Sequence, residues 1–316
     1  PAIISLMTSE RGHLDLVRGA LETVKHCVAP EDLTSEVKAE AAQCAELFTT
    51  DEQGTTTLLE LLEEDDWNIR FAVLKIFNGL LETRLEQLQL AVLHSPRGMT
   101  RLMDMVDDSR EIIRNEILLL LVALTQSNQE IQKIVAFEGA FDKLFEVVRE
   151  EEDGSIVGAD CLTIVANLLR DNSSNQTFFR ESGGIHAVAS VLKRHESETV
   201  TLAIDIIGIL LTRVDGDSAA AQNTAANQAA MGRGGVQAGL LALATGTEAP
   251  EGVKPKALRA LGLVLQSHEA NQNLFLDSPD ALSTLTELAL TAPTATERDG
   301  ATFALISWIR HNPSGQ

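Results

Sequence analysis

Two pairs of apolar residues, separated by a single position, recur along the chain at nearly regular intervals. The pattern appears as TTTLLELL from Thr55, MTRLMDMV from Met99, FDKLFEVV from Phe141, IHAVASVL from Ile185, VQAGLLAL from Val236 and LSTLTELA from Leu282. Successive starts differ by 44, 42, 44, 51 and 46 residues. Each copy leads through a short polar stretch into a longer segment with apolar residues at i, i+3, i+4 and i+7, which predicts an amphipathic helix.

A repeat of about 45 residues that holds two or three helices is typical of HEAT and armadillo proteins. One such unit cannot bury its own apolar faces, so neighbouring units stack around a continuous core. The predicted fold is an all-α, armadillo/HEAT-like, right-handed α-solenoid of about six to seven repeats, forming a single domain over 1–316. We expect a partial repeat at 1–50 and full repeats at 55–98, 99–140, 141–184, 185–235, 236–281 and 282–316.

A second motif falls between these copies, at the places where one long helix gives way to the next short one. NQEIQKIVAFEGAF at 128–141 is followed by looser versions, NQTFFRESGGI at 175–185, NQAAMGRGGV at 227–236 and NQNLFLDSPDAL at 271–282. We interpret it as a structural joint, in which the amides bond backbone groups at the end of the preceding long helix. Glycines, which tolerate a sharp turn, follow at Gly139, Gly183 and Gly235.

Two kinds of segment depart from this regularity. The stretch DGDSAAAQNTAANQAA at 215–230 lies in the longest interval, and its composition predicts a mobile loop insert. Acidic runs at 63–66 and 150–153 precede long helices, where carboxylates favour the helix N-terminus. For both runs we favour solvated turns over a patch that binds a partner.

Composition narrows the class of protein further. Aromatic residues make up only 4% and Tyr is absent, which favours helices over strands. The formal net charge of -21 argues against binding to nucleic acid, because the chain would repel a phosphate backbone. We identify no signal peptide and no apolar run long enough to span a bilayer. Because the chain starts at Pro1 and ends with HNPSGQ, we expect a fragment of a longer protein.

The sequence carries none of the motifs that would indicate an enzyme or a cofactor. There is no HExxH, paired CxxC, GxSxG or GxxxxGK[ST], and no histidine lies at metal-ligand spacing from another ligand. Cys27, Cys44 and Cys161 are interpreted as small buried thiols in a reducing compartment. A dyad of Cys161 and His186 is conceivable, but an apolar helix would stabilise a thiolate poorly. We therefore expect no catalysis, no cofactor and no bound metal.

A solenoid without catalytic motifs usually binds other proteins along the surface lined by its long helices. Asn78 and Asn167 occupy the position at which armadillo nuclear-import receptors place peptide-gripping asparagines. Those receptors carry a Trp one helical turn earlier, where this chain has Leu74 and Thr163. A peptide-binding armadillo adaptor of nuclear-import or junctional type is therefore the alternative function, supported at the level of fold.

One block resembles a particular family. The segment LLELLEEDDWNIRFAVLKIFNGLLE, followed by SPRGMTRLMDMVDDSREIIRNEILLLLVALTQSNQEIQKIVAFEGAFDKLFEVV, is similar to the globular head of the general vesicular transport factor family, the vesicle-tethering golgins. SREIIRNE and IQKIVAFE are its most specific parts. The resemblance extends over residues 55–180 and more loosely through the last two repeats, and HNPSGQ resembles the point where the head continues.

The resemblance implies a non-enzymatic tether in ER-to-Golgi and intra-Golgi transport, cytoplasmic and peripherally associated with Golgi and vesicle membranes. It implies recruitment by a Rab-family small GTPase, and contact with SNAREs, other golgins and the conserved oligomeric Golgi complex. Family members continue into a long parallel coiled coil, so the full-length protein is expected to be a homodimer. This chain lacks sustained heptads, which places the coiled coil outside it.

Arg110, Arg114 and Asn115 in DSREIIRN lie at helical spacing beside Asp107 and Asp108. We hypothesise that these three residues contact a partner. The competing interpretation is the solvated start of a long helix with local ion pairs.

Overall fold

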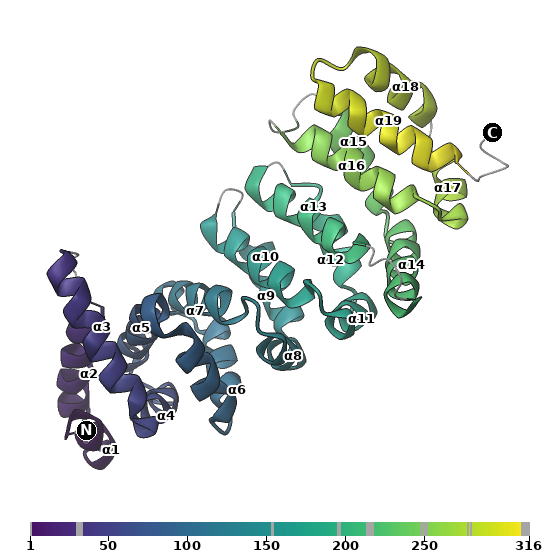
Figure 1. Cartoon of the computed structure of the whole chain (residues 1–316). Helices are drawn as coiled ribbons and strands as arrows, with labels where there is room; N and C mark the ends of the chain where they lie inside the picture. The colour runs from purple at the N-terminus through teal and green to yellow at the C-terminus, as the bar shows by residue number, and fades with distance from the viewer. Residues whose placement is uncertain are drawn as a thin grey trace. The chain divides into compact units, whose positions relative to one another are not determined.

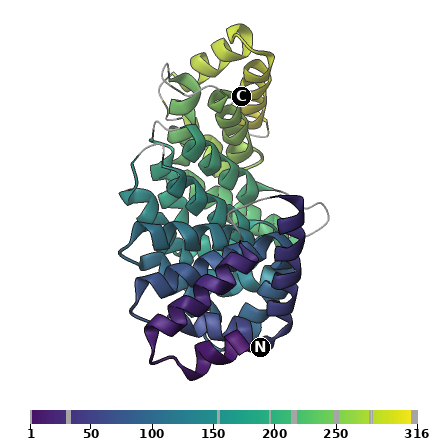
Figure 2. The ribbon, with the colours of Figure 1, turned by 90° about the vertical axis from the view of Figure 1, so that its left-hand side faces the viewer.

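The computed structural model describes residues 2–29, 34–152, 155–194, 197–212, 218–246, 249, 252–276, 278 and 280–310. Every regular element in these ranges is a helix, and none is a strand (Figure 1, Figure 2). The predicted all-α class is thereby confirmed. The chain divides into two compact units, Pro1–Leu144 and Phe145–Gln316, which are taken in turn. The expected chain-end segment at 311–316 lies outside the described residues.

The first unit alternates short helices with longer ones. Its helices are α1 (Ala2–Ser9), α2 (Leu14–Val28), α3 (Ser35–Thr50), α4 (Glu52–Leu61), α5 (Trp67–His94), α6 (Gly98–Asp104), the 3-10 turn η1 (Met105–Asp107), α7 (Glu111–Leu124), α8 (Gln129–Phe137) and the start of α9 (Ala140–Glu150). The long helices α2, α5 and α7 pack side by side in that order, and α4 covers the junction of α1, α5 and α6. Apolar side chains between these layers, such as Leu58, Ile76 and Phe77, are fully buried.

Helix α5 serves two repeats at once. Its 28 residues are interrupted at Arg84, which has φ -138° and ψ 29° and therefore lies outside helical geometry. The part before Arg84 is the long helix of one repeat, and the part after it is the short first helix of the next. An ion pair of 2.8 Å between Arg84 Nη2 and Glu46 Oε2 of α3 holds the interruption.

The second unit repeats the same three-helix plan. It contains α10 (Ile156–Leu169), α11 (Ser173–Glu181), α12 (Gly184–Val191), α13 (Ser197–Leu211), α14 (Ser218–Arg233), α15 (Val236–Thr245), α16 (Val253–Leu265), α17 (Glu269–Leu276), α18 (Ala281–Thr291) and α19 (Ala295–Ile309). The long helices α10, α13, α16 and α19 follow one another side by side (Figure 1). Aromatic rings close the core between layers, as where Phe275 meets Trp308 edge-on at 4.8 Å between centroids.

The turns between the short helices confirm the expected role of glycine. Gly139, Gly183 and Gly235 have φ of 81°, 88° and 75°. These left-handed conformations strain any residue that carries a Cβ. At two equivalent turns the chain uses Arg97 and Asp280, with φ of 60° and 59°, and accepts that strain.

The prediction of a mobile loop at 215–230 is wrong for the residues described. Residues 218–230 belong to the helix α14, and 215–217 lie outside the described part. Alanine and glutamine favour helix, and one face of α14 buries Thr224, Asn227, Gln228 and Met231. The polar composition that suggested a loop arises because amides occupy part of this buried face.

The structure also corrects the register of the joint motif. Asn128 is the N-cap of α8, where its Oδ1 accepts from the Ile131 N–H at 3.1 Å. Asn172 has the same role before α11, whereas Asn175 lies one turn further inside that helix. The residue of α8 that corresponds to Gln176 is therefore Gln132. The pair Asn128–Gln129, with which the first copy of the motif begins, lies one helical turn before the position of the NQ pair in the second copy.

At these joints, buried amides bond the last carbonyls of the long helices, as expected. Asn175 Nδ2 donates to Leu168 O at 2.8 Å, and Asn271 Nδ2 donates to Val264 O at 3.0 Å. The following glutamine can reach the next long helix, since Gln272 Nε2 donates to Ser307 O at 2.7 Å. Gln228 does likewise to Leu263 O and Gln266 O, at 2.8 and 3.0 Å. Such joints thus tie one long helix to the next.

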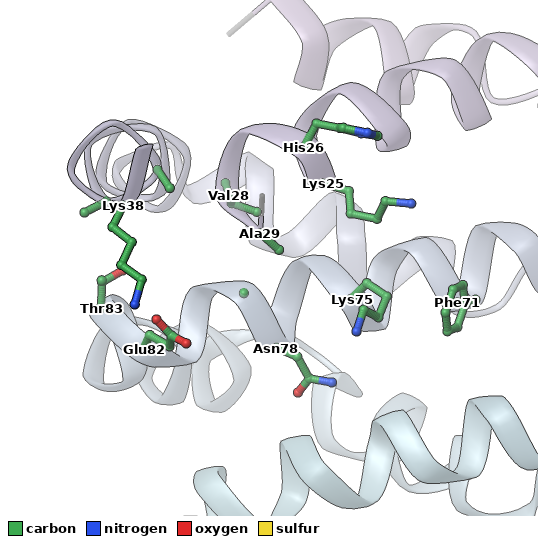
Figure 3. Close-up of a pocket in the computed structure, with 13 residues that line it drawn as sticks. Lys25, His26, Val28, Ala29, Lys38, Phe71, Lys75, Asn78, Glu82 and Thr83 are labelled. Atoms are coloured by element: carbon green, nitrogen blue, oxygen red, sulfur yellow. The ribbon is translucent and has the colours of Figure 1, made fainter. Parts of the chain in front are cut away.

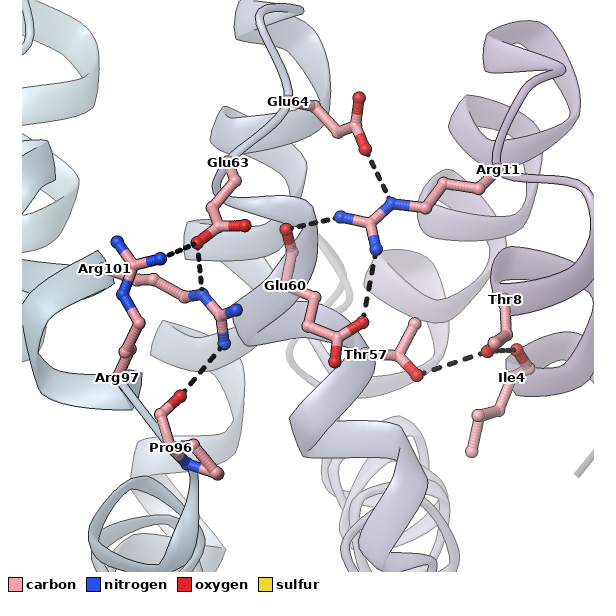
Figure 4. Close-up of polar contacts among 10 residues, drawn as sticks. All are labelled: Ile4, Thr8, Arg11, Thr57, Glu60, Glu63, Glu64, Pro96, Arg97 and Arg101. Atoms are coloured by element: carbon pink, nitrogen blue, oxygen red, sulfur yellow. Dashed lines mark hydrogen bonds and ion pairs between the residues drawn. The ribbon is translucent and has the colours of Figure 1, made fainter.

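The acidic run at 63–66 is more than a set of solvated turns (Figure 4). Arg11 bonds Glu60 and Glu64, while Glu63 pairs with Arg97 and Arg101 of the next repeat; the Arg11–Glu64 and Arg101–Glu63 contacts are 2.7 and 2.9 Å. Asp66 caps α5, as its place before a long helix suggested. In the run at 150–153, Asp153 lies outside the described residues.

We predict that Gln228→Ala destabilises the protein by on the order of 1–3 kcal/mol, because two partly buried carbonyls lose their donor. The control is Gln222→Ala in the same helix, where the side chain is exposed and alanine is a better helix former. Urea denaturation followed by circular dichroism measures both. Equal midpoints for the two variants would contradict the proposed stabilising role of the joint.

Candidate partner-binding groove

A groove of about 700 Å³ opens in the first unit where α2 ends beside α3 and α5 (Figure 3). Its floor is formed by one face of α5, and its sides are formed by the end of α2 and the first half of α3. The lining residues are Lys25, His26, Val28, Ala29, Lys38, Ala41, Ala42, Phe71, Lys75, Asn78, Gly79, Glu82 and Thr83. The lining therefore combines positive charge with small apolar side chains.

A glycine sets the shape of this groove. A Cβ at Gly79 would lie 2.5 Å from the Ala29 Cβ and 3.0 Å from the Val28 O, so only glycine lets α2 approach α5 this closely. Gly79 is helical, and an alanine there would otherwise favour the helix. Its presence is explained by the close contact between the two helices.

The lysines of the groove are paired to different degrees. Lys25 Nζ lies 2.6 Å from Glu22 Oε2, and its side chain is only 24% exposed. Lys75 Nζ lies 3.3 Å from Glu116 Oε1 of α7. Lys38 projects from α3 with an exposed side chain, and within the described ranges the structure gives it no ion pair. Lys38 is thus the cation of the groove that is most accessible to a ligand.

Asn78 lies in the groove, but its amide nitrogen is already engaged. Nδ2 donates to Glu116 Oε2 at 2.7 Å and to Glu116 O at 3.0 Å, whereas Oδ1 has no partner among the described residues. Leu74, one turn earlier, is fully buried, so it is not placed where an import receptor presents its Trp. The likeness to a Trp-and-Asn peptide ladder therefore does not extend to the geometry of α5.

Arg110 lies at the N-cap of α7 and faces α5. Its guanidinium carbon stands 5.8 Å from the ring centroid of Trp67. The backbone N–H of Arg110 donates to Asp108 Oδ1 at 2.9 Å. Asp108 Oδ2 in turn pairs with Arg70 Nη2 at 3.2 Å, in a largely buried contact. The first turns of α5 and α7 are consequently fixed against each other, with Trp67 and Arg110 left partly accessible.

Arg114 and Asn115 follow on α7, and both are half-buried. Asn115 Oδ1 is buried and has no hydrogen-bond partner in the part of the chain that is described. Asp107, expected beside Arg110, instead contacts Lys143 of α9. The three hypothesised contact residues share one helix, but only Arg110 presents an exposed side chain.

Asn167 belongs to α10 in the second unit and is half-buried. That unit has its own hollow of about 390 Å³, between the ends of α10 and α13 and the helices α11 and α14, with a largely polar lining. Asn223 Nδ2 there donates to Gln176 Oε1 at 2.7 Å. Its amides are engaged with one another, which suits a joint better than a binding site.

The thiols correct one expectation. Cys161 is fully buried, as predicted, but Cys27 is exposed and Cys44 half-buried. Burial and the nearby Cys27 raise the pKa of the Cys44 thiol, so it resists ionisation. In the described ranges, no three His, Cys, Asp or Glu side chains come together as a metal site would require. No described helix is long and apolar enough to cross a membrane.

Sequence reasoning found Asn78 and missed the rest of the groove. Lys25, Lys38 and Phe71 come from three separate helices, and no spacing rule connects them. The available signal was the scarcity of cations in an acidic chain, with 25 Lys and Arg against 46 Asp and Glu. A lysine that faces the same groove as a half-exposed phenylalanine can be recognised only once the helices are packed.

Comparison with known proteins finds several relatives. Golgin candidate 6 of Arabidopsis thaliana is 35% identical over 340 aligned residues, covering 100% of this chain and 37% of the relative. The human general vesicular transport factor p115 is 33% identical over 86% of this chain and 30% of its own length. The yeast transport protein USO1 is 29% identical over 85% of this chain and 16% of its own length. The chain thus spans about a third or less of these relatives. No protein-family model matches it.

Solved structures give the same picture of the fold. A crystal structure titled Uso1-2 superposes with a TM-score of 0.87, at 23% identity, over 98% of this chain and 55% of the other. A second, titled Uso1-1, gives 0.76 at 26% identity, over 94% of this chain and 50% of the other. A designed armadillo repeat protein gives 0.59 at 14% identity over 84% of this chain. The first and the last of these likenesses, at 23% and 14% identity, support the fold alone.

We predict that Gly79→Ala lowers the melting temperature, because its Cβ would force α2 away from α5, at a cost of about 1–3 kcal/mol. Gly19→Ala in α2 is the control, since nothing lies within 4 Å of its Cβ. That change should leave stability unchanged or raise it by up to about 1 kcal/mol. Differential scanning calorimetry compares the two; a Gly79→Ala variant as stable as the parent would show that the helices can separate freely.

We also predict an effect of acid at Asp66. Hydrogen bonding to Arg18, assisted by the N–H groups of Asn68 and Ile69, lowers the pKa of this carboxyl. The stabilisation is fully present above about pH 3.9, the pKa of an aspartate in the unfolded chain. It is lost as the pH falls through the lower pKa of Asp66 in the folded protein. The loss of stability of Asp66→Asn relative to the parent should therefore be largest near neutral pH and become smaller in acid. Melting curves from pH 7 to pH 2.5 measure it.

The matched control for this experiment is Asp65→Asn, which alters an exposed carboxyl next in the chain. Its difference from the parent should be small and nearly independent of pH. If the loss of stability of Asp66→Asn stayed constant down to pH 2.5, this would contradict the ion pair between Asp66 and Arg18.

Proposed function

The chain belongs to the general vesicular transport factor family, and on this premise we propose that it forms the armadillo-type head of a vesicle-tethering protein. The observation that carries the proposal is the match to golgin candidate 6 over the whole chain. Two Uso1 structures with the same stack of helices support it. The head acts as a non-enzymatic scaffold for proteins in ER-to-Golgi and intra-Golgi transport.

The proposed site of action is the cytoplasmic face of Golgi and transport-vesicle membranes, to which the protein attaches peripherally. A Rab-family small GTPase recruits it, and the conserved oligomeric Golgi complex, SNAREs and other golgins are its further partners. The full-length protein is a parallel homodimer joined by a coiled coil outside this chain. These statements extend the family resemblance, since the chain spans about a third of the relatives.

A nuclear-import or junctional adaptor is the less favoured function. The relatives carry names from vesicular and intracellular transport. The geometry of α5 also argues against an adaptor function, because Leu74 is buried and Asn78 donates to Glu116. Such an adaptor would need an accessible amide beside an aromatic residue on successive long helices.

Within the head, we propose the start of α7 as one contact for a partner. Arg110 is exposed and stands over Trp67, a pairing often found at protein interfaces. Arg114 and Asn115 continue the same stretch of α7 toward its middle. Asn78 and Asn167 remain proposed contacts on α5 and α10, with Asn78 held in place by Glu116.

The experiment that tests the proposed function is a pull-down with the purified chain against a panel of Golgi Rab proteins. Each Rab protein is loaded either with a non-hydrolysable GTP analogue or with GDP. We expect selective retention of at least one GTP-loaded member, because tethers of this family are recruited by active GTPases. Equal retention in both nucleotide states across the panel would reject recruitment through the head.

For the proposed contact on α7, we predict that Arg110→Glu/Arg114→Glu weakens binding of the retained Rab protein by tenfold or more. Two reversed charges change electrostatic complementarity at the interface. Arg149→Glu/Lys133→Glu is the control, which makes the same change in net charge at exposed positions of α9 and α8. Isothermal titration calorimetry gives the affinities. Unchanged binding by the first variant, with an unaltered circular dichroism spectrum, would remove this surface from the proposal.

A further inference from the structure

We propose that the groove between α2, α3 and α5 binds an acidic peptide segment of a partner protein, with one apolar side chain of that segment inserted against Phe71. The inference rests on the proposed function of the chain as a protein-binding head and names the chemistry of one ligand. It concerns a different surface from the start of α7.

The first argument is a local reversal of charge. The chain as a whole carries a formal charge of -21. The lining of the groove contributes three lysines against the single carboxylate of Glu82; Glu22 and Glu116, which pair with Lys25 and Lys75, lie beside this lining. Cations gathered in a recess of an anionic protein attract an anionic segment and repel most of the protein's own surface.

The second argument is that the cations are recessed. The side chain of Lys25 is 24% exposed and that of Lys75 is 40% exposed, so both side chains are partly shielded from water. Interactions between charges are stronger where solvent screening is reduced. Both lysines already have carboxylate neighbours, so an incoming carboxylate shares them, whereas Lys38 offers its charge directly.

The third argument is that the groove also has an apolar surface. Val28, Ala29, Ala41 and Ala42 lie on the walls, and Phe71 is half-exposed on the floor. Such a surface accommodates one aliphatic or aromatic side chain of a peptide.

A recess favours a peptide over a membrane surface. Lys25 and Lys75 lie on two helices that face each other across the groove, with α3 on a third side (Figure 3). A flat bilayer would reach the exposed Lys38 more readily than the partly shielded side chains of Lys25 and Lys75. An extended chain is narrow enough to enter and to contact all three.

The test uses fluorescence anisotropy with the whole chain and a fluorescein-labelled octapeptide. Six of its residues are glutamate, and a leucine and a phenylalanine occupy the centre. We expect saturable binding that weakens at least fivefold between 50 and 300 mM NaCl, since screening reduces charge attraction. A peptide with glutamine in place of every glutamate should bind at least tenfold more weakly.

Charge-reversal variants locate the binding. Lys25→Glu/Lys38→Glu should weaken binding of the acidic peptide by tenfold or more. Lys133→Glu/Lys193→Glu makes the same change in net charge at exposed positions on α8 and after α12, and should stay within twofold of the parent. Phe71→Ala should weaken the peptide that carries phenylalanine more than an all-glutamate one. Thermal melts confirm that each variant is folded.

Three results would overturn the proposal. The first is that the acidic peptide shows no saturable binding, and the second is that both double variants lose peptide affinity equally. The third is that Lys25→Glu/Lys38→Glu abolishes binding to phosphatidylserine vesicles but leaves peptide binding unchanged. The variant Lys25→Glu/Lys38→Glu is also tested for retention of the GTP-loaded Rab protein. If it retains the Rab protein, the proposed function of the head stands, and the peptide measurements alone test the proposed binding site in the groove.

Discussion

The structure depends on how the last carbonyls of each long helix are satisfied once the next repeat covers them. These groups cannot reach water, and the helix that bears them offers no further N–H. Asn175 and Asn271 supply donors to the long helix that precedes them in the chain. Gln228 and Gln272 supply donors to the long helix that follows them. Because these amides fit only one stacking register, they specify how repeats are joined as well as holding them together.

Charge has a comparable role on the outer layer of the first unit. Glu63 receives Arg97 and Arg101, and Arg11 reaches back across α4 to Glu60 and Glu64. Such exposed pairs are individually weak, but a network whose members lie on successive repeats opposes sliding between them. Packing of apolar faces supplies most of the stabilisation, while amides and ion pairs select the arrangement.

Much of the architecture could be predicted from the sequence because the same pattern of apolar positions recurs in successive repeats. The spacing of apolar pairs predicted helices, and Gly139, Gly183 and Gly235 marked turns that the backbone confirms. Local composition misled where it conflicted with tertiary burial, since the amides of α14 suggested a loop although they face the core. The groove could not be predicted, because Lys25, Lys38 and Phe71 meet only through the packing that Gly79 permits. Asn78 was identified by position, but its bond to Glu116 depends on a neighbouring helix.

The interruption at Arg84 has a consequence for how this part of the protein opens. Elsewhere a loop separates one repeat from the next, and a loop lets one repeat fray while its neighbour stays folded. Helix α5 runs through Arg84 without such a loop, so its two halves join directly at the kink. The repeats on either side are therefore coupled in their local unfolding, and amide hydrogens on both sides of Arg84 would exchange with solvent at related rates. A ligand that stiffens the groove on the first half of α5 would slow exchange in the second half without touching it.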